Sequence, residues 1–323
     1  MKHVEHIQKQ RPALDTRWRM LKQTREFFWS KGFTEVETPL VVRLPGQEPY
    51  LNPIPLVLHN ELGKTFAGYL HTSPEYTMKK MLTAGYEKIF FLGKTFRDCE
   101  SFGGMHNPEF TMIEWYRAHE DMSALMQDVE QLFQSLGYAQ SFERLHMRQL
   151  WKEYADLNLD TLLTAEALFA ACMSKGYHPD ADEQYEDLFY RIFLNEIEPR
   201  LAEQGPVIVH HYPAQMAALS KISADDPRYA ERFEVYIEGV EIANAFTELT
   251  NADEQLKRLT EERALRQKLG KDVFEIDPEF IEAVRSMPPA AGIALGFDRL
   301  VQVLAGCKDI DDVLVLPASK LFL

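Results

Sequence analysis

The stretch that decides the fold runs from Phe96 to Tyr116 and reads Phe-Arg-Asp-Cys-Glu-Ser-Phe-Gly-Gly-Met-His-Asn-Pro-Glu-Phe-Thr-Met-Ile-Glu-Trp-Tyr. Its two ends are predicted to be β-strands, because residues 89–96 and 110–116 are dense in aromatic, leucine and isoleucine side chains. Between them, the pair Gly103-Gly104 interrupts the pattern. Two strands joined by a glycine-bearing loop predict an antiparallel hairpin with a long tip.

The bases of this hairpin carry polar residues that suit an anionic ligand. Arg97 ends the first strand, and His106 and Asn107 open the second. An arginine that faces such a pair can bind a polyanion, and Phe110 offers a flat face for a base. The alternative interpretation is a hairpin tip that is merely solvated.

The hairpin resembles the second motif of class II aminoacyl-tRNA synthetases, and in particular of their lysyl branch. That motif contains Phe-Arg, an acidic residue, a variable loop and then His-Asn-Pro-Glu-Phe. The closest fit is to the paralogues in this branch that attach (R)-β-lysine to elongation factor P. Such relatives often carry an arginine before the histidine, where this chain has Gly104 and Met105 in a slightly longer loop. Contacts with a nucleotide are therefore expected from the bases of the loop.

Composition limits the class of protein. The chain has 323 residues, 46% of them hydrophobic, which suffices for one large core or two modest ones. It has no apolar run of about 18 residues, its first residues lack the apolar core typical of a signal peptide, and Cys99, Cys172 and Cys307 lie far apart. We expect a soluble, reduced, cytoplasmic protein. A net charge of −15 disfavours nonspecific nucleic-acid binding.

The N-terminal region is predicted to form a short arm at residues 1–13 and then a helix that Asp15-Thr16 caps and Gly32 ends. A strand over Phe33–Pro39 should follow. The order of helix, strand and proline resembles the first class II motif, which implies a homodimer interface. On its own, such a unit is more often plain scaffold.

Ser73, Pro74 and Glu75 precede an amphipathic helix that includes Met78 to Leu82. A serine N-cap, a proline at the first helical position and an acidic first turn are all typical of a helix start. That is the structural alternative for these three residues. The resemblance implies instead that they lie at the amino-acid pocket, with Glu75 on an amino group of the substrate.

A second hairpin is predicted within residues 231–251, with its turn at Glu238-Gly239. A two-residue turn would pair Glu234 with Ala243 and place Glu234 and Glu241 diagonally on one face. Two such carboxylates favour a hard cation between them, so Mg²⁺ is expected there.

Strict alternation in this hairpin would put Asn244 and Glu248 on the face opposite Glu241. A shared pocket therefore requires a bulge near residues 243–245. The segment resembles the lysyl family's Glu-Leu-Ala-Asn-Gly-Phe-x-Glu-Leu, which implies that Glu248 and Tyr116 bind the ε-ammonium of the substrate and Asn244 its carboxylate. The alternative is a half-buried sheet with acidic residues on its wet face.

Residues 290–305 combine a strand of small residues with a helix that Asp298 is expected to cap. Arg299 then lies where the helix dipole disfavours a cation, unless it binds a phosphate. The stretch resembles the third class II motif, which implies Arg299 on the ATP γ-phosphate and Gly296 beneath the adenine. Ala294 replaces a glycine of lysyl-tRNA synthetases, and one methyl group can shift isomer choice by about 1–3 kcal/mol.

The resemblance thus implies three groups of site residues. The residues implied to bind ATP are Arg97, Asp98, Cys99, Glu100, His106, Asn107, Phe110, Glu241, Ile242, Gly296 and Arg299, with Arg97 and Arg299 catalytic. Those implied for the amino acid are Ser73, Pro74, Glu75, Tyr116, Asn244, Glu248 and Ala294, and those implied for the metal are Glu234 and Glu241.

The expected fold is α+β, a class II synthetase catalytic fold with a mainly antiparallel sheet flanked by helices. We expect one domain over residues 1–323, with a helical insertion at about 138–204 containing helices near 164–175 and 182–203. His210 and His211 should follow in a strand and point to opposite faces, which argues against a metal there.

The resemblance implies ATP-dependent activation of (R)-β-lysine and its transfer to a lysine of elongation factor P. The first motif begins near residue 14, which leaves no room before it for an anticodon-binding domain, so no tRNA partner is expected. The alternatives are a compact lysyl-tRNA synthetase, a small-molecule amide ligase and a catalytically silent metabolite-binding paralogue.

Overall fold

The computed structural model describes all 323 residues. The α-helices are α1 (Lys2–Ser30), α2 (Glu75–Thr83), α3 (Met122–Ser135), α4 (Met147–Tyr154), α5 (Ala165–Ser174), α6 (Tyr185–Ile192), α7 (Glu198–Leu201), α8 (Ala252–Lys268), α9 (Pro278–Ser286), α10 (Phe297–Leu304) and α11 (Ala318–Leu321). The strands are β1 (Thr34–Glu35), β2 (Val41–Val42), β3 (Pro55–His59), β4 (Thr65–Leu70), β5 (Lys88–Phe96), β6 (Glu109–Ala118), β7 (Glu143–His146), β8 (Val207–Pro213), β9 (Tyr229–Ile237), β10 (Val240–Thr247) and β11 (Ala290–Gly296). Shorter helical segments are η1 (Leu159–Thr161), η2 (Phe193–Ile197), η3 (Ala214–Met216) and η4 (Ile310–Val313).

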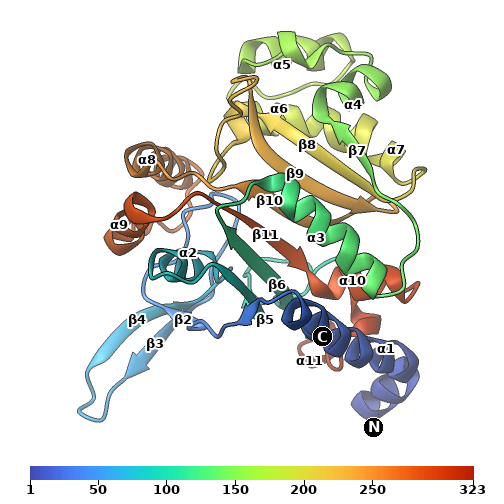
Figure 1. The fold of residues 1–323 in the computed structure, drawn as a ribbon, viewed down its shortest axis with the longest axis vertical. Coiled ribbons are helices and arrows are strands. Elements are labelled where there is room, and N and C mark those ends of the chain that lie inside the picture. The colour runs from blue at the N-terminus through green and yellow to red at the C-terminus, as the bar shows by residue number, and fades with distance from the viewer.

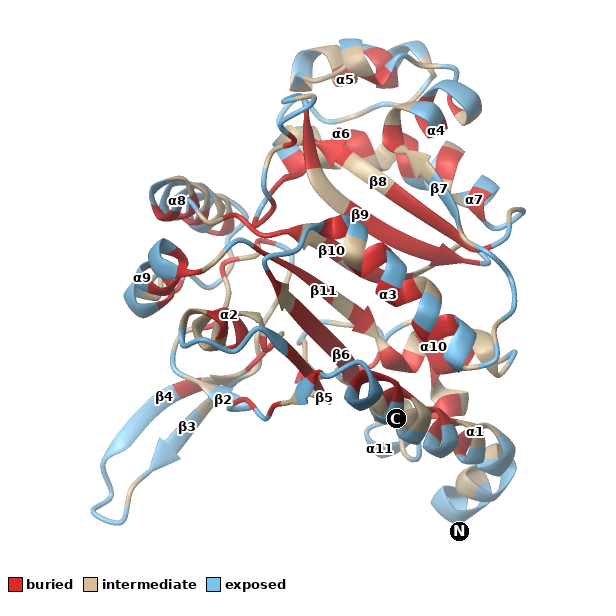
Figure 2. Ribbon diagram, in the orientation of Figure 1, coloured by how far each residue is buried: buried red, intermediate tan, exposed pale blue.

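An eight-stranded sheet in the order β1-β5-β6-β11-β10-β9-β8-β7 runs through the molecule (Figure 1). Only the outermost pairs, β1–β5 and β7–β8, are parallel. A smaller sheet, β2-β4-β3, projects from one end and is mostly exposed, whereas the central strands are buried (Figure 2). The predicted fold class, a mainly antiparallel sheet flanked by helices, is confirmed.

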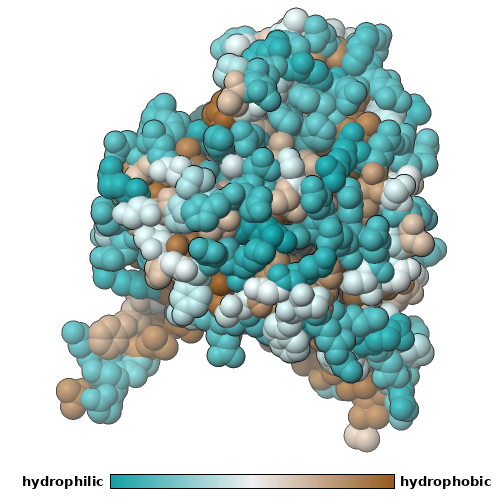
Figure 3. All heavy atoms as spheres, in the orientation of Figure 1, coloured by the Kyte–Doolittle hydropathy of each residue, from teal (hydrophilic) through white to brown (hydrophobic).

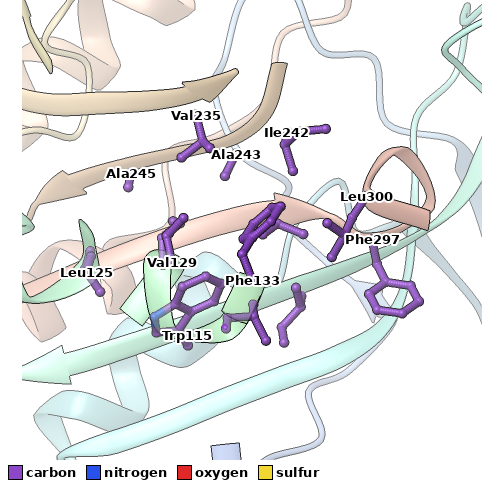
Figure 4. Packing of buried hydrophobic residues seen from close by; sticks show 14 of the residues in the cluster. Trp115, Leu125, Val129, Phe133, Val235, Ile242, Ala243, Ala245, Phe297 and Leu300 are labelled. Atoms are coloured by element: carbon purple, nitrogen blue, oxygen red, sulfur yellow. The ribbon is translucent and has the colours of Figure 1, made fainter. Parts of the chain in front are cut away.

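Successive side chains of β6 point alternately to the two faces of the sheet, of which one contacts the core and the other lines a cavity. Ile113 and Trp115 face a cluster of 30 buried residues contributed by the sheet and by α1, α3 and α10. Figure 4 shows the ring of Trp115 beside Val129 and Phe133 of α3. Since successive strand residues point to opposite faces, Glu114 and Tyr116 point the other way. That second face of the sheet lines the cavity described below.

Residues 143–213 build the end of the molecule drawn at the top of Figure 1. Their helices pack on β8 and β9 around a second cluster of 20 buried residues. The helices predicted near 164–175 and 182–203 correspond to α5 and to the run from α6 to α7. The strand β7 was not predicted, because Leu145 is its only aliphatic residue. It forms by parallel pairing with β8.

The predicted arm at residues 1–13 is wrong, because α1 is already helical from Lys2. Pro12 lies inside the helix, and Asp15-Thr16 are not its cap. The extension is held by the C-terminal region, where Asp312 accepts a 2.5 Å hydrogen bond from Gln10. Because these contacts join residues far apart in the sequence, the capping residues near position 15 could not predict where the helix begins.

The predicted strand over Phe33–Pro39 is also too long. Only Thr34–Glu35 pairs with β5, and it does so in parallel. The turn predicted at Glu238-Gly239 is confirmed. Both residues have positive φ, 53° and 78°, as a two-residue type I′ hairpin turn requires.

His210 and His211 do not point to opposite faces as predicted. The pairing of β8 with β9 shifts register between His210 and Tyr212, and His211 has a φ of 62°. This bulge brings the two Nδ1 atoms within 2.6 Å of each other. Bulges follow from tertiary pairing, so simple alternation fails at this point.

No helix is long and apolar enough to cross a membrane. The three cysteines are unpaired.

Candidate active site

The hairpin predicted from Phe96 to Tyr116 is confirmed as β5 and β6, which pair antiparallel from Lys88 with Arg117 to Phe96 with Glu109. The loop between them folds back on itself, since the N–H of Gly103 donates to the carbonyl of His106 (3.1 Å). Gly104 bonds to Asp309 and Ile310 beside η4. These bonds hold the bases of the loop over the open face of the sheet.

A cavity of about 620 Å³ lies on this face, within the usual range for small-molecule sites. The predicted site residues that line it are Ser73, Glu75, Arg97, Glu100, His106, Asn107, Phe110, Tyr116, Glu241, Ile242, Asn244, Ala294, Gly296 and Arg299. The predicted site residues outside its lining are Pro74, Asp98, Cys99, Glu234 and Glu248.

Asp98 and Cys99 lie at the exposed outer edge of the hairpin loop, where Asp98 accepts the N–H of Cys99. Ser73 and Pro74 start α2 much as their chemistry predicts, although Pro74 rather than Ser73 is the N-cap residue. The Ser73 hydroxyl accepts the N–H of Glu75 at 3.0 Å and also donates to Glu114 at 2.6 Å. The serine therefore starts the helix and reaches the pocket at once.

Two arginines mark one end of the cavity. The guanidinium of Arg97 lies over the ring of Phe110, 5.1 Å from its centre, and its buried Nε has no partner. Arg299 donates to the carbonyl of Glu241 (3.0 Å) and lies 2.9 Å from the Nε2 atom of His106. Burial and Arg299 lower the pKa of His106, so its neutral ring can accept this bond. The two cations suit an anionic group such as a polyphosphate.

Asp298 does not cap α10 as predicted, because Gly296 is the N-cap residue and Asp298 lies in the first turn. Its carboxylate instead accepts the N–H of Thr111 (2.9 Å) and pairs with Arg17 of α1. The side chain of Asp298, which the sequence predicted as a helix cap, is therefore paired with a cation from a distant part of the chain.

Asn107 has a structural task as well as a place in the lining. Its amide donates to the carbonyl of Glu109 at 2.6 Å and accepts the N–H of Ala318 at 2.9 Å. These bonds tie the start of β6 to the start of α11.

The bulge predicted in the second hairpin is confirmed, but it falls between Glu241 and Ala243 rather than over residues 243–245. As a result, Glu234 pairs with Asn244 and not with Ala243 as predicted. Residues opposite each other in a ladder share a face. The bulge therefore places Glu234, Glu241 and Asn244 on the cavity side.

The two predicted metal ligands differ in their surroundings. Glu234 is buried and accepts hydrogen bonds from Tyr212 and Tyr236 (both 2.6 Å) and Arg232 (2.8 Å). Glu241 is partly buried in the lining of the cavity. Burial and the neighbouring Glu234 raise the pKa of Glu241 to about 7. A cation beside Glu241 would relieve that repulsion.

No group of three or more His, Cys, Asp or Glu side chains is arranged to hold a metal by itself. A bound Mg²⁺ would therefore take most of its oxygens from elsewhere, as Mg²⁺ does when it bridges a substrate phosphate and one or two carboxylates. Glu241 fits this arrangement directly. Glu234 fits it if the Oε1 atom that accepts the hydrogen bond from Arg232 can also contact the metal.

Carboxylates gather at the other end of the cavity. Glu114 is 1% exposed and accepts hydrogen bonds from Ser73 (2.6 Å) and Tyr116 (3.1 Å). Burial and the nearby charge of Glu75 raise the pKa of Glu114 to about 8. A carboxylate whose ionised form is disfavoured by burial and by a neighbouring carboxylate favours a ligand ammonium group beside it.

Sequence reasoning missed Glu114. A signal was present, because a glutamate between Ile113 and Trp115 is out of place in a buried strand and shares its face with Tyr116. Its importance depends on Glu75, which belongs to a different element, so local pattern alone did not reveal the pair.

Glu248 forms a second carboxylate position behind Tyr116 and Gly292. Its side chain is fully buried, and its Oε1 atom has no hydrogen-bond partner. A Cβ atom at Gly292 would lie 2.2 Å from the Tyr116 ring and 2.4 Å from Glu248 Oε1, so only glycine fits there. Burial raises the pKa of Glu248 to about 8, although Lys79 acts in the opposite direction.

Ala294 lies in the lining of the cavity. It pairs with Glu114 on β6 and with Asn244 on β10, so all three share one face. Arg232 donates to the amide oxygen of Asn244 (3.1 Å), which leaves the amide N–H₂ to donate to a ligand. The methyl group of Ala294 therefore adjoins both an acidic and an amide position.

Comparison with known proteins agrees with this geometry. A family model described as class II tRNA synthetases (D, K and N) matches residues 4–320. The chain therefore belongs to the class II tRNA synthetase family.

Its relatives include proteins named elongation factor P–(R)-β-lysine ligase. That of Yersinia enterocolitica is 39% identical over 306 residues, that of Hamiltonella defensa 37% over 306 and that of Pasteurella multocida 38% over 302. Each match covers 92–93% of this chain and the same share of the relative.

Proposed function

We propose that this chain is an ATP-dependent ligase that activates (R)-β-lysine and joins it to a lysine side chain of elongation factor P. The observation that supports the proposal is a single cavity with two arginines at one end and carboxylates at the other, where a further buried carboxylate lies directly behind the lining residues Tyr116 and Gly292. One carboxylate position is formed by Glu75 and Glu114, and the other by Glu248. Two separated ammonium groups on one amino acid match two such positions.

The proposed first step joins the amino acid to AMP. A carboxylate oxygen of the amino acid attacks the α-phosphorus of ATP, the bond to the β-phosphate oxygen breaks, and pyrophosphate leaves with that electron pair. Arg97 is proposed to hold the α-phosphate and Arg299 the γ-phosphate. Neither side chain acts as a nucleophile, so catalysis comes from positioning and charge neutralisation.

The second step forms the amide. The neutral amine of the acceptor attacks the adenylate carbonyl, the acyl–phosphate bond breaks, AMP leaves, and the amine loses a proton. This acceptor is supported by the name of the relatives, which joins elongation factor P to (R)-β-lysine. The net charge of −15 also argues against broad contact with tRNA phosphates.

ATP is proposed to lie with its base against Phe110 and above Gly296. A Cβ at Gly296 would meet its nearest atom, the Arg299 Cδ, at 3.8 Å, so the floor here is flat and open. Mg²⁺ is proposed to bind Glu241, with Glu234 beside it. It would neutralise phosphate charge as pyrophosphate leaves.

A homodimer is proposed through α1 and the edge strand β1. Trp18 and Trp29 of α1 are 48% and 52% exposed, so both rings offer apolar area to a second copy of the chain. Figure 3 shows further apolar residues on the two projecting parts, the β3–β4 hairpin and the N-terminal end of α1. Sedimentation should give a dimer, and Trp18→Glu should shift it toward monomer.

The deciding experiment is ATP–pyrophosphate exchange without tRNA, with α-lysine and (R)-β-lysine measured side by side. We expect exchange that prefers (R)-β-lysine, followed by labelling of elongation factor P when that protein is added. A preference for α-lysine would point to tRNA or another acceptor. Absence of exchange with both isomers would overturn the proposal in favour of a silent paralogue.

A further inference from the structure

Lys79, in α2, is buried between the carboxylates of Glu75 and Glu248. With Glu114, these two glutamates form the proposed amino-acid region. Its ammonium nitrogen lies 2.5 Å from Glu75 Oε1 and 2.6 Å from Glu248 Oε2, and only 1% of its side chain is exposed. The rings of Phe246 and Phe280 lie over it at 5.5 and 5.9 Å. Lysine is rarely buried this completely, because an ammonium out of water must be paired.

The charged and titratable groups around Lys79 come from three places. Glu75 lies on α2, Glu114 and Tyr116 lie on β6, and Glu248 follows β10. The helix α9 contributes the ring of Phe280, which also stacks on Tyr76 of α2 with 3.8 Å between ring centres. Burial alone would lower the pKa of Lys79, but Glu248 and Glu75 together raise it above its ordinary value. Lys79 is therefore a permanent cation.

This cation sets the charge balance of the region. When Glu75, Glu114 and Glu248 are all ionised, Lys79 neutralises one of the three carboxylates, and two negative charges remain. A substrate with two ammonium groups neutralises that remainder. A substrate with one would leave a buried charge unpaired, which is costly in a desolvated pocket.

Lys79 also leaves the ligand side of Glu248 free. The lysine lies against Oε2, whereas the buried Oε1 has no partner and lies at the close approach between Gly292 and Tyr116. A buried carboxylate oxygen without a donor is where a ligand ammonium group is needed.

We propose that Lys79 is a positioning and specificity residue, which holds Glu75 and Glu248 in place and, by its charge, selects an amino acid with two ammonium groups. This inference rests on the proposed function, because it concerns recognition of the same diamino acid. Without Lys79, one carboxylate would stay unneutralised when the diamino acid is bound. A proton can replace the missing charge at low pH but not at high pH.

The test compares Lys79→Met with Lys80→Met in ATP–pyrophosphate exchange at pH 6.5 and 8.5. Lys80 is the matched control, because it follows on the same helix but pairs with Asp277 (2.6 Å) away from the cavity. For Lys79→Met we expect the KM for (R)-β-lysine, relative to the unmodified protein, to rise roughly tenfold or more at pH 8.5 and clearly less at pH 6.5. The KM for ATP should not change. A KM effect that is equal at both pH values, or no larger than that of Lys80→Met, would overturn the inference.

A substrate-free measurement separates this inference from the proposed function. If the unmodified protein exchanges with neither lysine isomer, the proposed function fails, but urea unfolding still tests the charge balance. The deficit in stability of Lys79→Met should grow from pH 6 to pH 9, because the folded state then holds an uncompensated carboxylate. A deficit that is constant with pH would overturn the charge balance.

A second variant guards against loss of folding. If Lys79→Met does not fold, the double variant Lys79→Met with Glu248→Gln removes one charge of each sign and should fold. Failure of that double variant would show that the core needs the lysine stem rather than its charge, which would overturn the inference.

Discussion

Arg17 of α1 and Asp298 of α10 form a buried ion pair, with Nη1 2.5 Å from Oδ1. Arg17 also donates to the Thr111 hydroxyl at 2.7 Å, and Asp298 accepts the N–H of the same threonine at 2.9 Å. Three segments far apart in the sequence therefore meet at one polar point. The third of these segments is α10, which carries Arg299, so the Arg17–Asp298 pair supports the end of the site where we propose that phosphate binds.

Replacement of Arg17 by methionine should destabilise the fold strongly. It leaves the Asp298 carboxylate buried without its cation, and breaking such a pair typically costs about 3–5 kcal/mol. Urea unfolding measures the change. Arg19→Met is the control, since Arg19 is exposed on the same helix. Equal midpoints for the two variants would contradict a supporting role for the pair.

Arg299→Ala should abolish most adenylate formation while it leaves the fold intact. Loss of one preorganised cation at a developing charge costs about 10²–10³-fold in kcat. The rate of ATP–pyrophosphate exchange gives the loss, and thermal unfolding checks the fold. Arg285→Ala, on the surface of α9, should keep the unmodified rate. Near-normal exchange by Arg299→Ala would contradict the proposed role of Arg299 in adenylate formation.

Glu241→Gln should raise the Mg²⁺ concentration needed for half-maximal exchange by about tenfold or more, as loss of a ligand or its support does at metal sites. Glu234→Gln should raise it as well, but should also lower the unfolding midpoint, because Glu234 holds Arg232 and two tyrosines. Glu238→Gln, in the exposed turn of the same hairpin, is the control. An unchanged Mg²⁺ requirement in Glu241→Gln would show that Mg²⁺ does not bind that carboxylate.

Glu114 should make stability depend on pH when no substrate is present. Its folded-state pKa of about 8 exceeds the ordinary value of 4.5, so the folded protein keeps a proton that the unfolded chain releases. The stabilising contribution is complete below pH 4.5 and is lost as pH rises through about 8. Unfolding midpoints between pH 5 and 9 should fall less steeply in Glu114→Gln.

Glu109→Gln is the matched control for this measurement, because Glu109 lies on the same strand but is exposed. Its midpoints should follow those of the unmodified protein. If the unfolding midpoints of Glu114→Gln fall with pH as steeply as those of Glu109→Gln, the pKa of Glu114 is not raised in solution.

Ala294→Gly should weaken the preference for (R)-β-lysine over α-lysine. Removal of one methyl group from a tight pocket is worth about 1–3 kcal/mol, or roughly 10–150-fold in the ratio of kcat/KM values. Exchange with both isomers gives that ratio. Ala291→Gly makes the same change on the same strand, but Ala291 faces the core. An unchanged ratio in Ala294→Gly would show that isomer choice lies elsewhere.

Much of the site followed from the sequence because its pieces are local. The β5–β6 hairpin and the turn at Glu238-Gly239 depend on alternation and on residues that tolerate positive φ, and each pattern lies within one continuous segment of the chain. The small residues of β11 likewise predicted a strand that a flat ligand can approach. These features gave the fold class, and 14 of the 19 site residues that the resemblance implied line the cavity.

Tertiary structure decided what depends on partners distant in the sequence. The start of α1 at Lys2, the pairing of Asp298 with Arg17 and the position of the bulge after Glu241 all arise from contacts between separate elements. Lys79 has Glu75 four residues away on its own helix, but it meets Glu248 only in the folded protein, and Glu114 gains its raised pKa only when Glu75 of α2 folds against it. Burial and charge pairing depend on the whole fold, and the order of residues along one strand or helix does not encode them.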